Sequence, residues 1–358
     1  MKKVQLGICL LASLLLMQAY RISQDAGIFV EIRPLAYGHC EKLSGPPGSE
    51  DITIDRRQKV AFISAANGRA ALQHYQDGTA SALENGDIWL LDLSEKDGQP
   101  YPLNVDIDGR FHPHGIDLLT LDNGQRELYV VNHPFREQHE ILIFDVGDNH
   151  RLSFRQRVKY PELISPNDIT TLQQGQFLVT NDHGSPQTSF MARVEEYLGL
   201  SRSSVTYYDG SQGSFVIKGL KSANGITLSA DQKMLYVAEA IGRKIKRFER
   251  GQSVREWLLV EELSVGTAVD NLEWRAEGSL LAGTHPKLFD FLGHAANVEH
   301  LSPSQVIEID VRNSPMTFQN VYMNDGEELS GSSVATSYEG QLLIGAVFES
   351  HFLRCHED

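Results

Sequence analysis

Oxygen-bearing side chains recur at the start of short apolar segments along this 358-residue chain. In SPNDITTL at 165–172, Asn167 and Asp168 stand directly before a run of β-branched and apolar residues. The same pattern, a polar residue before a short apolar segment, recurs at five other places. These begin with Glu50 and Asp51, His114, Asn224, Asp270 and Asn271, and Ser332 and Ser333. Carboxylate and amide oxygens, with no thiolate among them, are the ligands that calcium prefers. These residues therefore predict a calcium site.

Each of these starts is followed by a turn and by a second segment rich in β-branched and aromatic residues, as in two paired strands. The starts lie at residues 50, 114, 167, 224, 270 and 332, and the intervals suit one four-stranded blade with its loops. The sequence therefore predicts an all-β fold, a six-bladed β-propeller. In a propeller the innermost strands begin beside the central channel, so the oxygen-bearing residues should face one another there.

Neighbouring residues on a strand point to opposite sides, and this alternation divides the predicted ligands into two groups. Glu50 and Asn167 should face one way, and Asp51 and Asp168 should face the other way. The alternation favours two calcium ions in the channel over one.

Composition limits the classes of function. The chain has 32 basic and 47 acidic residues, a formal net charge of −15, which is the wrong sign for binding a phosphate backbone. We expect no nucleic-acid partner. Because the repeat runs from residue 50 to the end, residues 21–358 are predicted to form one domain.

The N-terminal residues 1–20 resemble an export signal. Lys2 and Lys3 precede the apolar run LGICLLASLLLM at 6–17, which is short for a membrane span. Two forms stay open, a cleaved signal peptide and an uncleaved signal anchor. The protein is expected to be exported, and hence secreted, periplasmic or membrane-anchored.

Two cysteines lie near the ends of the predicted ring. Cys40 precedes the first repeat and Cys355 lies three residues from the last residue. A propeller brings its first and last strands together, so a disulfide between them would close the ring in an oxidising compartment. The alternative is two free thiols in a cytosolic protein, which the export signal disfavours.

Three segments interrupt the strand pattern. Residues 65–86 read as a long loop, and we interpret them as a lid over the channel. Residues 188–200 have apolar side chains at helical spacing and predict a helix, which either packs on the core or presents an apolar face to a substrate or membrane. Residues 285–304 read as an irregular loop whose histidines lack zinc spacing. Membrane association is expected through the N-terminal segment and the 188–200 helix.

The chain resembles the paraoxonase (serum paraoxonase/arylesterase) family over nearly its whole length after the signal. The matching stretches are GSED at 48–51, HPHGID at 112–117, VVNHP at 130–134, PNDI at 166–169, TNDH at 180–183, ANGI at 223–226, VDN at 269–271, GTHP at 283–286 and GSSVATSYEGQLLIGAVF at 331–348. The resemblance implies a six-bladed propeller with two calcium ions that hydrolyses lactones and aryl esters. The 65–86 segment has no clear counterpart in the family, which leaves substrate preference open.

The resemblance also implies a role for particular residues. The catalytic calcium would be held by Glu50, Asn167, Asn224, Asp270 and Asn271, and the structural calcium by Asp51, Asp168 and the backbone carbonyl of Ile116. His114 and His133 would activate water, His285 would lie in the pocket wall, and Cys40 and Cys355 would form the disulfide. Binding of one ion by both Asp270 and Asn271 breaks the strand alternation and requires a local bend, which only the resemblance implies.

Calcium with an open coordination position polarises an ester carbonyl, and a general base then prepares the water. His114 is the natural base because its unperturbed pKa is ~6.5. A carboxylate ligand, Asp270 or Glu50, is the alternative base. No GxSxG motif indicates a serine hydrolase.

The leading hypothesis for function is therefore a calcium-dependent lactonase and arylesterase acting on small molecules. One alternative is a non-catalytic propeller that uses calcium for stability and binds a partner on its top face. Another is a sugar lactonase of the gluconolactonase type, which the two-ion pattern disfavours.

Overall fold

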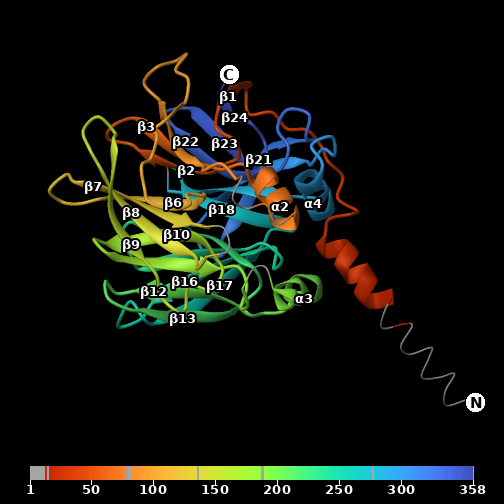
Figure 1. Cartoon of the computed structure of the whole chain (residues 1–358). Helices are drawn as coiled ribbons and strands as arrows, with labels where there is room; N and C mark the ends of the chain where they lie inside the picture. The colour runs from red at the N-terminus through yellow and green to blue at the C-terminus, as the bar shows by residue number, and fades with distance from the viewer. Residues whose placement is uncertain are drawn as a thin grey trace, which may run out of the picture.

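A computed structural model describes residues 13, 16–77, 79, 83–134, 137–186, 189–275 and 278–357. Within these ranges the strands form four separate four-stranded sheets and one eight-stranded sheet. Figure 1 shows the sheets arranged around a common centre, with helices gathered on one side. Apolar clusters fill the space between neighbouring sheets, and one of them joins Leu178 and Val205 to Leu235 and Phe248 of the next sheet.

In each four-stranded sheet the strands follow sequence order and pair antiparallel. Their bounds are β6 (Pro113–Thr120), β7 (Arg126–Asn132), β8 (Glu140–Val146) and β9 (Leu152–Val158); β10 (Pro166–Gln173), β11 (Gln176–Asn181), β12 (Ser203–Tyr208) and β13 (Gly213–Leu220); β14 (Ala223–Leu228), β15 (Met234–Glu239), β16 (Lys244–Arg250) and β17 (Trp257–Ser264); β18 (Ala268–Trp274), β19 (Leu280–His285), β20 (Ser304–Asp310) and β21 (Thr317–Asn324).

The eight-stranded sheet combines both ends of the chain. Its strands are β1 (His39–Ser44), β24 (His351–His356), β23 (Gln341–Ala346) and β22 (Ser332–Tyr338), then β2 (Ser49–Asp55), β3 (Val60–Ala65), β4 (Asp87–Asp92) and β5 (Tyr101–Pro102). The two halves join where Ser49 pairs with Ala346. This contact is close because Gly345 has no side chain: a Cβ there would lie 2.3 Å from the carbonyl oxygen of Ser49.

The prediction of a propeller-like, all-β fold is confirmed, but the prediction of six separate blades is not. The described residues form four separate blade sheets and one larger sheet, because hydrogen bonding continues from β23 to β2. The predicted strand starts agree with the structure. Each falls within two residues of the start of an inner strand, namely β2, β6, β10, β14, β18 or β22. These strands contact one another in that order, and β22 contacts β2 to close the ring.

The ring is closed covalently as well. β1 pairs antiparallel with β24, and this register places Cys40 opposite Cys355. The two cysteines form a disulfide, as predicted. The first strand of the chain is thereby fixed to the last.

Every inner strand has an irregular register at its start. The irregularities fall at 49–51, 113–116, 166–169, 223–226, 269–272 and 332–334. A bulge of this kind adds an unpaired residue and turns a side chain away from strict alternation. The local bend that Asp270 and Asn271 would need to bind one ion together is therefore present at 269–272.

The helices connect second strands to third strands. Since inner strands begin at one end of the ring and second strands return to it, these connections lie at the end where the inner strands begin, here called the entry end. The helices are α2 (Gly68–Asp77), α3 (Phe190–Leu198) and α4 (Leu288–Ala296). Figure 1 shows all three on the same side as the N-terminal helix.

Two of these helices correct the sequence analysis. The 65–86 segment contains α2, although residues 78 and 80–82 lie outside the described residues. The prediction of a loop over 285–304 was wrong, because α4 occupies part of it. α4 is only nine residues long and has no side-chain N-cap, so the usual start signal is missing. The predicted helix at 188–200 is confirmed as α3, which Ser189 caps; residue 188 is not described.

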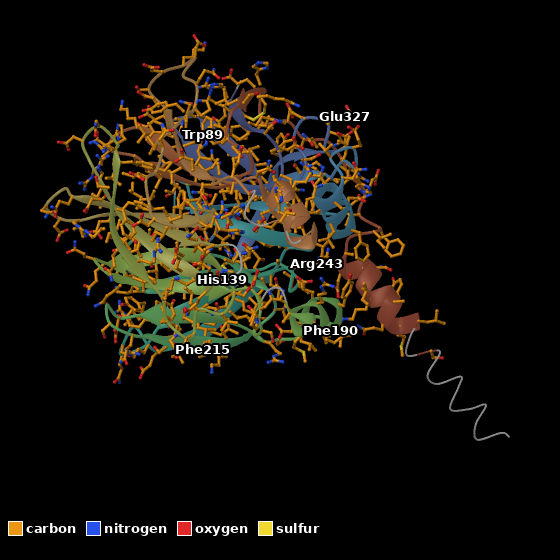
Figure 2. The ribbon with its side chains drawn as sticks, viewed as in Figure 1. Trp89, His139, Phe190, Phe215, Arg243 and Glu327 are labelled. Atoms are coloured by element: carbon orange, nitrogen blue, oxygen red, sulfur yellow. A yellow bond between two sulfur atoms is a disulfide. The ribbon has the colours of Figure 1, made fainter. Side chains whose placement is uncertain are left out.

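The N-terminal segment is described only in part. Residues 1–12, which carry most of the expected export signal, lie outside the described residues, and residues 16–25 are helical. The end of this helix contacts the entry end: Leu288 N–H donates to Ala26 O over 2.9 Å, and Arg243 Nη1 donates to Gln24 O over 2.6 Å. Arg243 lies beside the N-terminal helix in Figure 2. Among the described residues, no helix is long and apolar enough to cross a membrane.

Candidate functional site

The predicted site residues come from two structural positions at the entry end. Glu50, Asn167, Asn224, Asp270 and Asn271 lie at the starts of inner strands. The second strands end at the same place, and the predicted histidines follow from that: β7 ends at Asn132, directly before His133, and β19 ends at His285. The structure thus brings these residues to one end of the ring.

Glu50 links the two ends of the chain at the centre of the site. Asn271 Nδ2 donates to Glu50 Oε1 over 2.8 Å and to Glu50 O over 3.0 Å. Ser333 Oγ donates to the same backbone oxygen over 2.6 Å. Burial raises the pKa of Glu50 well above its usual range, and the charges of Asp51 and Asp270 raise it further. The carboxylate is therefore in a position that favours a nearby cation.

Several oxygens at this point lack hydrogen-bond partners. Within the part of the chain that the structure describes, Glu50 Oε2, Asn167 Oδ1, Asn224 Oδ1 and Asn271 Oδ1 are buried and unpaired. Burying an unpaired polar atom is unfavourable, so four such atoms at the starts of four inner strands favour a bound ligand. Hard oxygen donors fit calcium. In the described residues, no group of three or more His, Cys, Asp or Glu side chains could hold a metal ion. Three of the four oxygens here belong instead to asparagine side chains.

Asp51 and Asp168 make a second buried pair, with different partners. Asp51 Oδ2 accepts from Ile116 N–H over 2.7 Å, and Asp168 Oδ2 accepts from Ile226 N–H over 2.8 Å. Burial raises the pKa of Asp51 to about 7 and also raises that of Asp168, to which the charge of Asp51 adds. The backbone of Ile116 is therefore at Asp51, as expected, but it is the N–H that makes the contact.

Two glycines allow neighbouring inner strands to approach at the site. A Cβ on Gly115 would lie 2.6 Å from both Asn167 O and Asp168 Oδ1, and a Cβ on Gly225 would lie 2.5 Å from Asp270 O. Only glycine fits these spaces, and any side chain would push the candidate ligands apart.

His114 is held beside the candidate ligands. Its Nδ1 lies 3.1 Å from Asn167 O and 3.3 Å from Glu50 Oε2. Burial lowers the pKa of His114, although Asp270 and Asp182 act in the opposite direction. The imidazole is therefore neutral near pH 7, the state that a proton acceptor requires.

The predicted partner of His114 is close to it. The ring centroids of His114 and His133 are 4.9 Å apart. Burial lowers the pKa of His133 well below its usual range, and the charges of neighbouring histidines lower it further. A third histidine, His139, packs on the other side of His133, and the sequence analysis did not single it out.

His285 contacts a candidate ligand directly. Its Nε2 lies 2.8 Å from Asp270 Oδ2, and its ring stacks on Phe291 of α4 with a centroid distance of 3.8 Å. Both His285 and Asp270 are about 5% exposed. The residue predicted for the pocket wall therefore contacts both Asp270 and the helix that the sequence analysis missed.

Other polar residues at the entry end were also missed. His183 Nδ1 lies 2.6 Å from Asp182 Oδ1, and its Nε2 lies 3.0 Å from Glu196 Oε1 on α3. Burial alone would lower the pKa of His183, but its hydrogen bonds to the two carboxylates outweigh burial and raise the pKa to about 10. His183 follows the end of β11, so the rule that second strands end at the site would have found it.

His183 should stabilise the fold in a pH-dependent way. Its folded pKa lies above the ordinary 6.5, so its contribution is complete below about pH 6.5 and disappears as pH rises through about 10. Replacing it by His183→Gln should therefore lower Tm most at acidic and neutral pH. The difference from wild type should shrink toward pH ~10. Thermal unfolding of both proteins across this range measures it.

Glu196→Gln is the matched control for this prediction. It removes one of the two partners of His183 and leaves Asp182 in place. The loss of Tm should then be smaller and confined to a narrower pH range. A Tm difference for His183→Gln that does not change with pH would contradict the ion-pair origin of the effect.

Two further carboxylates, Asp117 and Glu273, lie farther along inner strands β6 and β18. Asp117 Oδ2 accepts from Thr171 N–H over 2.6 Å. Burial raises the pKa of Glu273, and the charges of Asp51, Asp117 and Asp168 add to this. The centre of the ring is therefore strongly acidic beyond the predicted ligands.

Known structures share this fold. A gluconolactonase from Xanthomonas campestris has a TM-score of 0.54 at 15% identity, over 90% of this chain and 94% of that one. Regucalcin from Agrobacterium tumefaciens, titled a calcium-binding protein, has a TM-score of 0.51 at 11% identity, over 90% of this chain and 94% of that one. The chain thus has the propeller-like fold of this class of proteins.

Sequence comparison is more specific. The family model for arylesterases matches residues 31–356. Serum paraoxonase/lactonase 3 is 34% identical in Oryctolagus cuniculus, over 90% of each chain, and 35% identical in Homo sapiens, over 89% of each. Serum paraoxonase/arylesterase 1 of Homo sapiens is 33% identical over 89% of each chain. The chain belongs to the arylesterase family and is an esterase or lactonase enzyme.

Proposed function

We propose that this protein is a calcium-dependent hydrolase of lactones and aryl esters. The observation that carries the proposal is the group of buried, unpaired oxygens of Glu50, Asn167, Asn224 and Asn271 beside His114. The group combines hard donors for a cation with a neutral proton acceptor, which are the two components of metal-assisted hydrolysis.

The proposal places two calcium ions. The first would be held by Glu50, Asn167, Asn224, Asp270 and Asn271, and the second by Asp51, Asp168 and the carbonyl of Ile116. Two buried carboxylates with raised pKa values favour a cation at the second position. When bound at the first position, calcium would polarise the ester carbonyl and stabilise the oxyanion that forms on it.

His114 would accept the proton of the attacking water. A backbone carbonyl only accepts hydrogen bonds, so the contact with Asn167 O places the ring proton on Nδ1. The lone pair of Nε2 is then free to take a proton from water. Glu50 Oε2, 3.3 Å from Nδ1, would stabilise the positive charge that develops on the ring.

The other predicted residues would act around this step. His133, next to His114, would receive the proton from it. His285 would orient Asp270 and, with Phe291, form part of the pocket wall. The alternative general base is a carboxylate, Glu50 or Asp270, whose oxygens would then be shared between calcium and water.

We also propose a six-bladed ring, in which the eight-stranded sheet contributes two blades. The six inner strands in cyclic contact support this count. Residues 21–358 would form this single domain, following an export signal at 1–20. Secretion of the protein is suggested by the names of its serum relatives.

Membrane association would use the entry end. Apolar side chains are exposed on α3 and on the helical residues 16–25: Phe190 is 80% exposed, Tyr197 65% and Leu16 71%. Phe190 projects from α3 near the N-terminal helix in Figure 2. A surface of this kind buries its apolar face in a lipid interface.

A substrate panel tests the proposed function. We expect purified protein with calcium to hydrolyse an aryl acetate and an aliphatic lactone, and to act more slowly on a sugar lactone. Titration of the released acid measures all three reactions on one scale. A clear preference for the sugar lactone would favour the gluconolactonase type, and no turnover of any of the three would favour a non-catalytic binding protein.

A further inference from the structure

Three histidines form a continuous row at the entry end. The ring centroids of His114 and His133 are 4.9 Å apart, and those of His133 and His139 are 4.6 Å apart at an interplanar angle of 72°. His139 comes from the connection between β7 and β8, directly before Glu140. Figure 2 labels His139 near the middle of the molecule.

Two ring nitrogens of this row lack hydrogen-bond partners. Among the described residues, His133 Nε2 and His139 Nδ1 are buried and have no hydrogen-bond partner. Rings at this separation are in contact, and a water within reach of both nitrogens would satisfy both atoms.

The charge state of the row suits proton transfer. Burial lowers the pKa values of His133 and His139, so both rings favour the neutral form. The groups that face His139 are His133, His114 and Asp182, and the charge of Asp182 raises the pKa of His139 against burial. His139 forms one end of the row. His139 itself is partly exposed, so this end reaches solvent.

The proposed hydrolysis requires a path by which a proton leaves the general base His114. Water gives its oxygen to the carbonyl carbon and one proton to His114, the ester C–O bond breaks, and the leaving alkoxide takes up the proton that the carboxylic acid product loses. The carboxylic acid formed ionises near pH 7, because its pKa is about 4. Each turnover therefore releases one proton net, and the base must lose a proton before the next cycle.

We propose that His139 is the outer member of a three-histidine proton relay, which carries this proton from His114 through His133 to solvent. The relay rests on the proposed function and adds a residue to it. His139 does not contact the reacting atoms, so it is a relay residue that acts through His133. His114 takes up and releases the proton at Nε2, whereas His133 and His139 each take up a proton on one nitrogen and release a proton from the other.

Two substitutions separate a relay from simple packing. His139→Phe keeps an aromatic ring against His133 but has no nitrogen, whereas His139→Ala leaves space that imidazole from solution can fill. We expect both to lower kcat for an aliphatic lactone about 10-fold, less than the 10²–10⁴-fold span for a general base itself, with little change in KM. Added imidazole should restore kcat of the Ala variant and not of the Phe variant.

His150→Asn is the matched control. His150 is also partly exposed with an unpaired Nδ1, but it lies in the β8 to β9 turn at the opposite end of the ring. It has a φ of 61°, which Asn tolerates. The kcat of the His150→Asn variant should equal that of wild type and should not change when imidazole is added.

Several results would overturn the relay. Wild-type kcat in His139→Phe would mean that the ring only packs, and a slow His139→Ala that imidazole does not rescue would mean that its loss is structural. If His139→Ala fails to fold, kcat of the Phe variant decides alone. These outcomes require an active wild-type enzyme, so they differ from failure of the proposed function, in which wild type itself does not hydrolyse the lactone.

Discussion

Removal of calcium with a chelator should abolish hydrolysis of lactones and aryl esters and also lower Tm. The unpaired oxygens of Glu50, Asn167, Asn224 and Asn271 would lose their shared partner. The buried carboxylates of Asp51 and Asp168 would repel each other. An ion bound only by the folded state, present at about 100 times its Kd, adds about 2.7 kcal/mol to the free energy of unfolding.

Activity and Tm should be followed together during chelation and again after metals are added back. Calcium should restore both, and magnesium should restore less, because it demands a smaller octahedral shell and keeps its water. Full activity after exhaustive chelation, with the absence of metal verified by elemental analysis, would refute the metal-dependent mechanism.

Substitution of His114 by glutamine should slow hydrolysis by about 10²–10⁴-fold, the usual range for loss of a general base. Glutamine can still donate a hydrogen bond toward Asn167 O but cannot accept the proton of water at this pH. Calcium content and Tm should change little, because His114 supplies no oxygen to the proposed ion. Steady-state kcat and bound calcium are the two measurements.

His112 provides the matched control in the same strand region. Burial lowers its pKa to about 4, and its Nε2 is buried without a partner, so it is, like His114, an imidazole whose neutral form is favoured by burial. His112→Gln should leave kcat close to wild type. If His114→Gln loses less than about tenfold with its metal intact, well below the general-base range, the base is a carboxylate such as Glu50 or Asp270.

The inner strands could be predicted from sequence because polar residues stand at their starts, directly before β-branched and apolar residues. Asn167 and Asp168, for example, stand between a turn and the buried residues of β10. The grouping of strands into sheets could not be predicted in the same way. Whether β23 hydrogen-bonds to β2 depends on the close approach of Gly345 to Ser49, and a periodic pattern carries no information about contacts between distant segments.

The candidate site residues at the starts of inner strands were easier to predict from sequence than those on the connections between strands. His139 lies on a connection, where no periodicity indicates its neighbours, and only the fold brings it to His133. His183 could have been predicted, since it lies two residues after the end of β11, much as His133 directly follows β7. α4 was missed because its nine residues are too short for a strong helical pattern.

The hydrogen bonds to Glu50 O determine how late in synthesis this part of the ring can form. Glu50 O accepts from Asn271 and from Ser333, and β1 finds its partner only in β24. A nascent chain that has emerged as far as β21 still lacks the strands that close the ring. The hydrogen bonds that hold Glu50 O in the proposed cation site can therefore all form only after β22 has been synthesised, and the ring can close only after β24.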